Sequence, residues 1–175
     1  MQAEVVGVSM AVAAGVACYV PIAHGKIGAD LFGESAQLPG QIALRDALER
    51  LKPLLNDPFT LKIGHDLKFD ALVMAQHGIT IAPFDDTMLM SYALDAGRGG
   101  HGLSELAERH LGHLCLSMDD VLAHSAGAKK SAKTFAGVPI DKATEYAAEG
   151  ADVTLRLWSL LKPRLAAERV ATVYE

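Results

Sequence analysis

The first residue that could carry chemistry is Asp70, because it falls on the apolar face of a predicted helix. Leu67, Ala71 and Met74 recur at the spacing of one helical face, with Asp70 among them. A carboxylate on a core-facing stripe is costly to bury unless it is paired or binds a metal. Two structural interpretations stay open, an ion pair with Lys68 or a nearby arginine and a helix rotated to expose Asp70. The functional alternative is metal coordination.

A second group of residues with chemical potential lies in segment 146–155, which reads YAAEGADVTL. Tyr146, Gly150, Val153 and Leu157 fall along one face of a predicted helix. A glycine inside a helix costs about 1 kcal/mol relative to alanine, so Gly150 is unusual there. Taken alone, Tyr146 is typical of a core tyrosine whose hydroxyl has found a hydrogen-bond partner.

The two acids of this segment, Glu149 and Asp152, point away from that face. Both are expected to be solvated or paired with a nearby cation. Lys142 is the candidate partner of Glu149, and Arg156 is the candidate partner of Asp152.

Histidines and cysteines are the other possible metal ligands. His110 and His113 could place two rings on one helix face, but Gly112 lies between them, and no carboxylate or third histidine stands at a diagnostic spacing. The sequence therefore does not favour a zinc site. Cys18 and Cys115 are far apart and are expected to be buried free thiols in a reducing cytoplasm. The remaining histidines considered are His65, His77, His101 and His124.

Composition limits the classes of protein to consider. The chain has 175 residues, of which 50% are hydrophobic, 21% charged and 6% aromatic, so it can bury a sizeable core in one domain. With 16 Lys+Arg against 21 Asp+Glu the formal charge is -5, which excludes a generally basic nucleic-acid coat. The apolar stretch 5–22 is broken by glycines and Pro21 and opens without basic residues. We therefore expect a soluble, cytoplasmic protein.

The elements that must position these residues follow from periodicity and turn signals. The chain is expected to begin with a β-hairpin and to end with a long helix. The expected elements are strands 5–12 and 16–22, a helix over 42–55 stopped near Pro53, strand 59–64, a helix from Leu67 to 77–78, strand 79–81, a helix from 85–86 to Leu94, a helix over 103–111, and a helix from Asp141 to about Leu165. This order predicts an α/β fold with a mixed sheet and a single domain over residues 1–175.

Several segments together resemble a known family. Segment 63–70, IGHDLKFD, resembles the second exonuclease motif, GxNLKxD, of bacterial DNA polymerase I. Segment 86–92, DTMLMSY, is similar to its DTML-x-SY helix, and segment 101–109, HGLSELAER, to its H-x-M-x-x-LA-x-R segment. Segment 146–155 is similar to YAAEDADVTL, the third motif, and Thr134-Phe135 falls in register. The resemblance covers essentially the whole chain, in order.

The resemblance implies a ribonuclease-H-like fold and a 3'–5' proofreading exonuclease that removes mispaired nucleotides from primer ends. In that family four carboxylates hold two divalent metals, Mg²⁺ or Mn²⁺, which activate water and stabilise the leaving oxygen. Carried over by position, Asp70 is a metal ligand and Tyr146 the catalytic tyrosine that orients the attacking water. Phe135 is an aromatic beside the terminal nucleotide, where stacking on a base is sequence-tolerant. The implied partners are single-stranded DNA 3' ends and a polymerase domain in the same polypeptide.

The sequence also departs from the family pattern. The Asp-x-Glu of the first motif belongs on a strand upstream of Met1, and the metal-ligand aspartate of the third motif is Gly150. Of the four family carboxylates only Asp70 remains, because Asp152 lies about 200° around the helix from Gly150. Asp66 replaces the usual asparagine among the nucleic-acid-binding positions and adds negative charge one helical turn from Asp70.

The strand that carries the first motif also has a structural role, because in this fold it lies in the middle of the sheet. Without it, its neighbours need other partners for their backbone groups. The expectation is a piece of a longer polypeptide, with a differently closed sheet or self-association as the alternatives.

Three functional hypotheses follow. The first is a truncated proofreading-exonuclease domain that is deficient in two-metal catalysis. The second is a non-catalytic module that supports a polymerase or binds single-stranded 3' ends, with Lys129, Lys130 and Lys133 near Phe135 contacting phosphates, unless that run is only a solvated loop. The third is an active enzyme that rebuilds its ligand set from the acids at positions 66, 70, 149 and 152.

Overall fold

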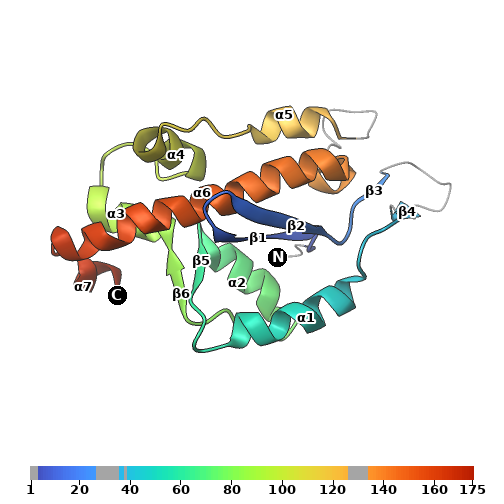
Figure 1. The fold of residues 1–175 in the computed structure, drawn as a ribbon, viewed down its shortest axis with the longest axis horizontal. Helices are drawn as coiled ribbons and strands as arrows, with labels where there is room; N and C mark the ends of the chain where they lie inside the picture. The colour runs from blue at the N-terminus through green and yellow to red at the C-terminus, as the bar shows by residue number, and fades with distance from the viewer. Residues whose placement is uncertain (1–3, 27–35, 38, 126–133) are drawn as a thin grey trace.

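The computed structural model describes residues 4–26, 36–37, 39–125 and 134–175 (Figure 1). Its strands are β1 (Gly7–Ala13), β2 (Val16–Pro21), β3 (Gly25–Lys26), β4 (Ala36–Gln37), β5 (Lys62–Gly64) and β6 (Phe84–Asp86). Its helices are α1 (Leu44–Asn56), α2 (Leu67–Ala75), α3 (Thr87–Asp95), α4 (Leu103–Leu111), α5 (Met118–Ala123), α6 (Ile140–Ala167) and α7 (Ala171–Tyr174), with a 3-10 turn over Phe135–Gly137.

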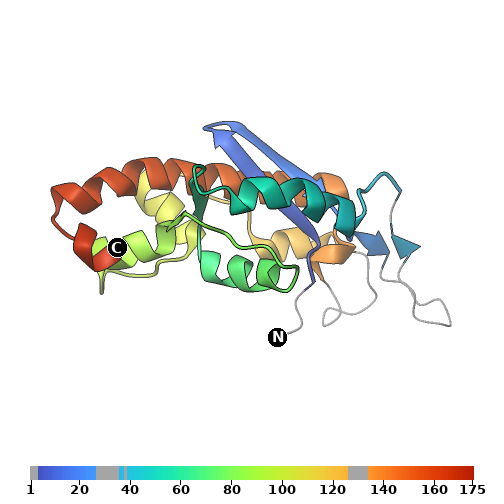
Figure 2. The same cartoon turned by 90° about the horizontal axis from the view of Figure 1, so that it is seen from below.

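The predicted hairpin is confirmed. β1 pairs antiparallel with β2 from Gly7↔Pro21 to Ala13↔Val16, with an irregularity after Ala11. Gly15 closes the turn with a φ of 77°, a left-handed conformation that favours glycine. The amide N of Gly15 donates a hydrogen bond to Oδ1 of Asp152 on α6 at 2.6 Å. The hairpin therefore lies on α6, as both ribbon views show (Figures 1 and 2).

The pair formed by β5 and β6 differs from the sequence-based prediction. β5 and β6 run parallel, with Ile63 opposite Asp85, whereas a strand had been expected at 79–81. Ile79 and Ile81 are buried in the core between α1 and α2, but their segment forms no strand. The amide of Ile79 instead bonds to the carbonyl of Met74 and prolongs the end of α2. The alternation of Ile79 and Ile81 thus correctly predicted that both side chains are buried, but the strand predicted from it is wrong.

The expected mixed sheet is divided into separate pieces. In the described residues β1–β2, β3–β4 and β5–β6 are three two-stranded sheets, and no hydrogen-bonded strand joins β1 to β5. The α/β class is confirmed, and the open edges of β1 and β5 agree with a fold that lacks its first central strand. Each edge leaves backbone donors and acceptors without a ladder partner.

The core is organised around α6. Its face packs Leu157, Leu161 and Leu165 against Met90 of α3 and Leu106 of α4. α6 begins at Ile140, one residue before the predicted start at Asp141, and ends at Ala167, slightly beyond Leu165. No helix within the described ranges is both long and apolar enough to cross a membrane.

Two helix assignments needed correction. α1 continues to Asn56 although a stop was expected near Pro53. A proline removes only its own bond to the carbonyl four residues earlier, so the turn that follows it can stay helical. The short helix α5 was not predicted at all, although its N-cap Ser117 accepts hydrogen bonds from the amides of Asp119 and Asp120.

Candidate functional site

One buried carboxylate holds the two helices that frame the site. Oδ2 of Asp86 accepts the amide of Leu67 at 2.7 Å, and Oδ1 accepts the amide of Asp66 at 3.2 Å. The same Oδ1 accepts the amide of Met88 at 2.8 Å, which caps α3. Asp86 is 2% exposed, so its negative charge is stabilised chiefly by these N–H donors at two helix N-termini. This arrangement fixes α2, and with it Asp70.

Asp70 projects from the first turn of α2 at the rim of a small hollow. The hollow has a volume of about 200 Å³ and lies beside the start of β1. It is lined by Glu4, Val5, Val6, Gly7, Phe69, Asp70, Val73, Met74 and Phe135. The Asp70 side chain is exposed, so α2 is rotated to place it at the edge of the apolar stripe. In the described part of the chain no cation pairs with it, which leaves the Lys68 interpretation unsupported.

The surroundings of Asp70 disfavour its charged form. Although solvent reaches the side chain, closely packed neighbours desolvate the carboxyl, and the negative charges of Asp66 and Asp86 add repulsion. Together these effects raise the pKa of Asp70 to about 6. A carboxylate held close to other carboxylates is the electrostatic arrangement that a cation relieves.

Replacing Asp70 by asparagine is therefore expected to stabilise the chain at neutral pH. The folded-state pKa lies above the unfolded value, so the stability that the protonated form supplies is present below about pH 4 and is lost as pH rises through about 6. Asp70→Asn should unfold at a higher temperature than the unsubstituted chain at pH 7.5, and the difference should shrink toward pH 4. Thermal melts across this range test it, with exposed Glu108→Gln as the net-charge control. A lower melting temperature for Asp70→Asn at pH 7.5 would contradict the assignment.

Phe135 connects this hollow to Tyr146. Its ring lines the hollow with Asp70, and its centroid lies 5.9 Å from the Tyr146 ring on α6. The ring of buried His24 packs against Phe135, with 5.7 Å between the ring centroids. Hydrogen bonds with the Tyr19 hydroxyl and the Val138 carbonyl hold His24 in place. The three predicted site residues 70, 135 and 146 thus follow one another across one region of the fold.

Tyr146 is half-buried. Among the described residues no hydrogen bond to the Tyr146 hydroxyl forms. Burial, followed by the proximity of Cys115 and Glu149, raises the pKa of this phenol above its usual range. Tyr146 therefore keeps its proton at neutral pH and has a hydroxyl available for an external partner.

The space around Gly150 does not require a glycine at this position. A Cβ at this position would meet only Cδ2 of Leu103, at 3.7 Å, which is an ordinary van der Waals contact. The helix is continuous there, and Thr154 donates its hydroxyl to the Gly150 carbonyl at 2.8 Å. A side chain could thus stand at the position where the resemblance places a metal-ligand aspartate.

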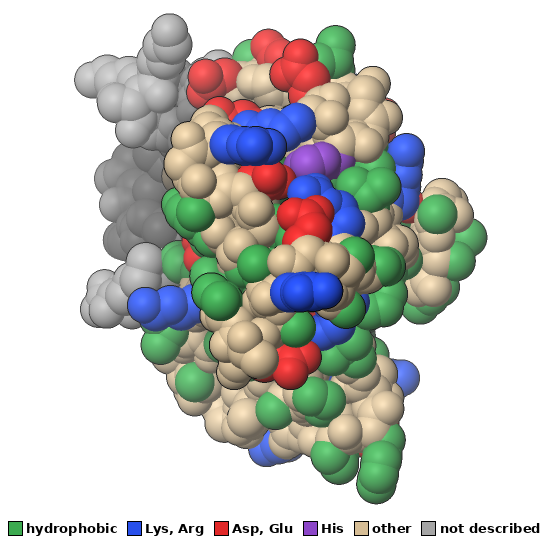
Figure 3. Space-filling model, turned by 90° about the vertical axis from the view of Figure 1, so that its left-hand side faces the viewer, with side chains coloured by type: hydrophobic (Ala, Val, Ile, Leu, Met, Phe, Trp, Pro, Cys, Tyr) green, Lys and Arg blue, Asp and Glu red, His purple; other side chains and the backbone are tan. Residues whose placement is uncertain are grey.

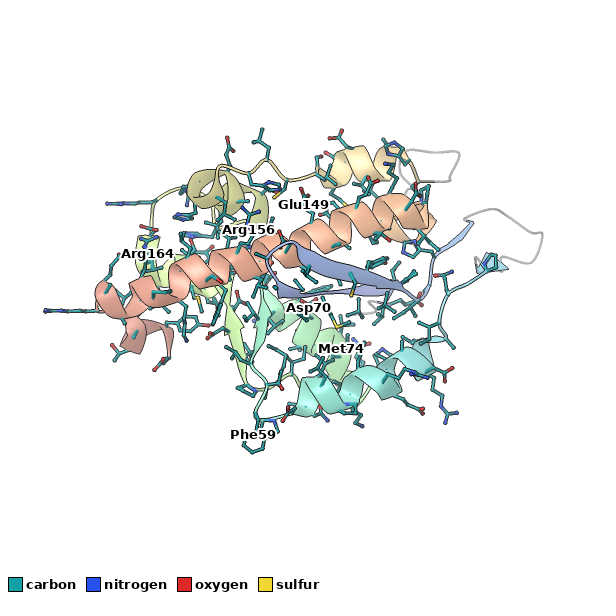
Figure 4. All side chains as sticks on the ribbon, viewed as in Figure 1. Phe59, Asp70, Met74, Glu149, Arg156 and Arg164 are labelled. Carbon is teal, nitrogen blue, oxygen red and sulfur yellow. The ribbon has the colours of Figure 1, made fainter. Side chains whose placement is uncertain are left out.

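The neighbouring acids are engaged elsewhere. Asp152 pairs with Arg156 at 3.7 Å, as expected, and accepts the hairpin amide. Glu149 does not pair with Lys142, whose ammonium bonds to Glu145. It contacts His113 and an amide of the α4–α5 connection on the far side of α6 from Asp70, as Figure 4 shows. A rebuilt ligand set that joins Asp70 to Glu149 and Asp152 therefore has no geometric support.

Two features of the site region were not predicted from the sequence. Asp85 and Asp86 were expected only to open a helix, yet both are buried and bind several donors. His113 was set aside for lack of a nearby carboxylate, but Glu149 lies within hydrogen-bond distance of it. Both depend on long-range contacts that sequence spacing does not report. Lys129, Lys130 and Lys133 lie outside the described residues.

The face at the α7 end carries charges of both signs. Lysine and arginine side chains there are interspersed with acids and form no basic patch (Figure 3). Arg164 pairs with Asp95 at 3.4 Å and with Glu168 at 2.8 Å, so its charge is locally neutralised. Nothing on this face favours a phosphate backbone.

The hairpin, the parallel strand pair and the long helix that carries YAAEGADVTL are arranged as in exonucleases of the ribonuclease-H-like fold. Residues 3–166 match the family model described as 3'-5' exonuclease, and the chain belongs to this family. It is 50% identical over its whole length to DNA polymerase I of Rhizobium leguminosarum and, over 95% of its length, 42% identical to DNA polymerase I of Pseudomonas aeruginosa. The chain spans 18% and 17% of these two relatives.

A solved structure shares the fold. Brucella melitensis NrnC with bound Mg²⁺ superposes with a TM-score of 0.54 at 24% identity, over 80% of this chain and 62% of that one. The chain thus resembles the 3'–5' exonuclease domain of DNA polymerase I in sequence and NrnC in fold.

Proposed function

We propose that this chain is the proofreading exonuclease domain of a DNA polymerase I and that, as residues 1–175, it is catalytically impaired. Its substrate would be the single-stranded 3' end of DNA, and its partner a polymerase domain in the same polypeptide. The support is the family match together with the identity to DNA polymerase I from two bacteria. Asp70 and Phe135 in the hollow, with Tyr146 beside the Phe135 ring, agree with a site for a terminal nucleotide.

The observation that carries the proposed impairment is Gly150. The resemblance places a carboxylate there, and the space beside the helix would accept one, but the chain supplies none. Among the described residues, Asp70 belongs to no group of three possible ligands that could hold a metal ion; the one such group is His113, Cys115 and Glu149. Asp86 is saturated by backbone amides. The residues present therefore do not fit two divalent ions beside Asp70.

A divalent metal remains plausible for the family as a whole. Two hard cations need several carboxylate oxygens, and residues 1–175 offer mainly Asp70 at this position. Further ligands would have to come from a segment outside these residues. With Asp70 alone, we expect metal occupancy to be lost, so that catalysis is abolished instead of merely slowed.

The second candidate is a binding module for single-stranded 3' ends. It is favoured by the rings of Phe69 and Phe135, which line the hollow and could stack on a base. The charges of the described lining residues oppose it, because these include Glu4 and Asp70 but no lysine or arginine. Phosphates would be repelled there unless a cation intervened.

The proposal is tested by digestion of a 5'-labelled single-stranded oligonucleotide with Mg²⁺ or Mn²⁺. We expect no ladder of shortened products from the unsubstituted chain or from Gly150→Asp, because even the restored acid gives Asp70 only one added carboxylate. A proofreading-competent DNA polymerase I serves as the positive control. Gly150→Asp must first melt as a folded protein, which its open surroundings lead us to expect.

The possible results separate the hypotheses. A metal-dependent ladder from the unsubstituted chain that Asp70→Ala abolishes would refute impairment. A ladder from Gly150→Asp alone would locate the impairment entirely at that position. Fluorescence anisotropy of the same mixtures reports binding without cleavage, and salt-sensitive binding without a ladder would favour the second candidate.

A further inference from the structure

A group of three possible metal ligands lies on the opposite side of α6 from Asp70. His113 and Cys115 belong to the connection between α4 and α5, and Glu149 belongs to α6. The imidazole nitrogen, thiol sulfur and carboxylate oxygen lie within 4.8 Å of one another. Figure 4 shows Glu149 on the side of α6 that faces this connection.

The backbone holds the three side chains together. α4 ends at Leu111 and is capped by Gly112, whose left-handed φ of 61° allows the chain to change direction. The amide of Leu116 donates to Oε2 of Glu149 at 2.7 Å. This bond orients the carboxylate so that Oε1 points to Nε2 of His113 at 2.9 Å. The cluster is thus built by tertiary contacts between two separate segments.

The ligand types select the metal. A thiolate and an imidazole favour zinc over the hard cations Mg²⁺ and Ca²⁺, and a carboxylate commonly completes such a set. We propose that His113, Cys115 and Glu149 bind one zinc ion, with water as a fourth ligand. His113 and Glu149 are partly exposed, with side-chain accessibilities of 34% and 20%, so an ion can enter from solvent.

Small movements suffice to form the site. Tetrahedral zinc with such ligands separates its donor atoms by about 3.5 Å. His113 and Glu149 must move slightly apart from their present contact. Because all three donor atoms lie within 4.8 Å of one another, the sulfur of Cys115 has to move by at most about 1 Å. Binding replaces the hydrogen bond between Nε2 of His113 and Oε1 of Glu149 with two metal bonds. The Nε2 proton is given up to solvent, and a neutral ring takes a proton at Nδ1 in its place. Binding also releases the thiol proton of Cys115 to solvent, so that sulfur binds as the thiolate.

An ion pair between His113 and Glu149 is the competing interpretation. It accounts for His113 and Glu149, whereas Cys115 is placed by packing against the α3–α4–α6 core and by its hydrogen bond with Ser104. A bound metal would instead link the α4–α5 connection to α6 within one helical turn of Tyr146. The inference does not depend on nuclease activity, since no residue of the Asp70 hollow takes part.

Titration with Co²⁺, a spectroscopic substitute for Zn²⁺, tests the site in the reduced chain without nucleic acid. We expect one equivalent to bind with a sulfur-to-cobalt charge-transfer band, and excess Zn²⁺ to remove the band. Cys115→Ser should lose the band, whereas Cys18→Ser, which changes an exposed cysteine on β2, should keep it. His113→Ala and Glu149→Gln should each weaken Co²⁺ binding by at least about tenfold.

The change in melting temperature on adding Zn²⁺ provides a second measurement that still reports metal binding when a substitution destabilises the fold. Zn²⁺ should raise the melting temperature of the unsubstituted chain and of Cys18→Ser but not of Cys115→Ser. The inference is overturned if the band persists in Cys115→Ser, or if Co²⁺ does not saturate at one equivalent. It is also overturned if Glu149→Gln binds Co²⁺ as tightly as the unsubstituted chain.

Discussion

Asp86→Ala is expected to lower the free energy of unfolding by about 3 kcal/mol, because it removes the cap of two helices at once. The lost carboxylate accepts the amides of Asp66 and Leu67 before α2 and of Met88 and Leu89 at the start of α3. Alanine would leave these donors in a buried position without partners. Urea unfolding at neutral pH measures the change.

Two controls separate capping from general sensitivity to mutation. Asp86→Asn keeps one acceptor oxygen and should fall between the unsubstituted chain and Asp86→Ala. Asp46→Ala removes an exposed acid from the first turn of α1 and should cost about 0.5 kcal/mol. A loss below about 1 kcal/mol for Asp86→Ala would show that water replaces the carboxylate, and the proposed anchoring of α2 would then be wrong.

Asp85→Ala is expected to be nearly as costly, about 2 to 3 kcal/mol, for a different reason. Buried Asp85 accepts side-chain donors from the C-terminal helices, namely Trp158 Nε1 at 2.7 Å, Lys162 at 3.1 Å and the Tyr174 hydroxyl at 2.9 Å. Its removal leaves the indole N–H of Trp158 without an acceptor and removes the hydrogen bond that links Tyr174 of α7 to Asp85. The cost stays below that of a fully buried ion pair because Lys162 can turn to solvent.

The pH dependence of this effect has a definite sign. Burial alone would raise the pKa of Asp85, but hydrogen bonds from Trp158, Lys162 and Tyr174 outweigh it and hold this pKa below its usual range. The stability from Asp85 is therefore present above the unfolded pKa of about 4 and is lost as pH falls through the lower folded value. Denaturation of the unsubstituted chain and of Asp85→Ala should converge in acid. A difference that stays constant down to pH 2 would contradict this.

Local patterns predicted the elements better than the contacts between them. The hairpin, the helix at 103–111 and the long C-terminal helix all carry strong periodicity or turn signals, and the structure confirms them. Strand β6 was misplaced because Ile79 and Ile81 alternate like a strand yet pack under α2. Parallel pairing of two three-residue strands has no local signature, since its partners are 22 residues apart, as in Ile63 and Asp85.

The candidate site shows the same limit. Asp70 was found because a carboxylate on an apolar stripe violates a local rule, and the structure places it where its pKa is raised. Its suggested pairing with Lys68 failed because α2 is rotated by the anchoring at Asp86. Glu149 was assigned to Lys142 by helical spacing, but its true partners come from a loop 36 residues away in sequence. Spacing along one helix cannot report a partner on another segment.

The position of the hairpin on α6 has a consequence for the order in which the chain can be assembled. Strands β1 and β2 are synthesised before α6, the helix against which they mainly pack, and the Gly15–Asp152 bond spans 137 positions. During synthesis the apolar residues of β1 and β2 therefore stay without this packing partner until α6 has been made. Closure of such long loops makes folding slow compared with a helical bundle of equal size. Until α6 has been synthesised, β1 and β2 therefore lack the helix against which they pack.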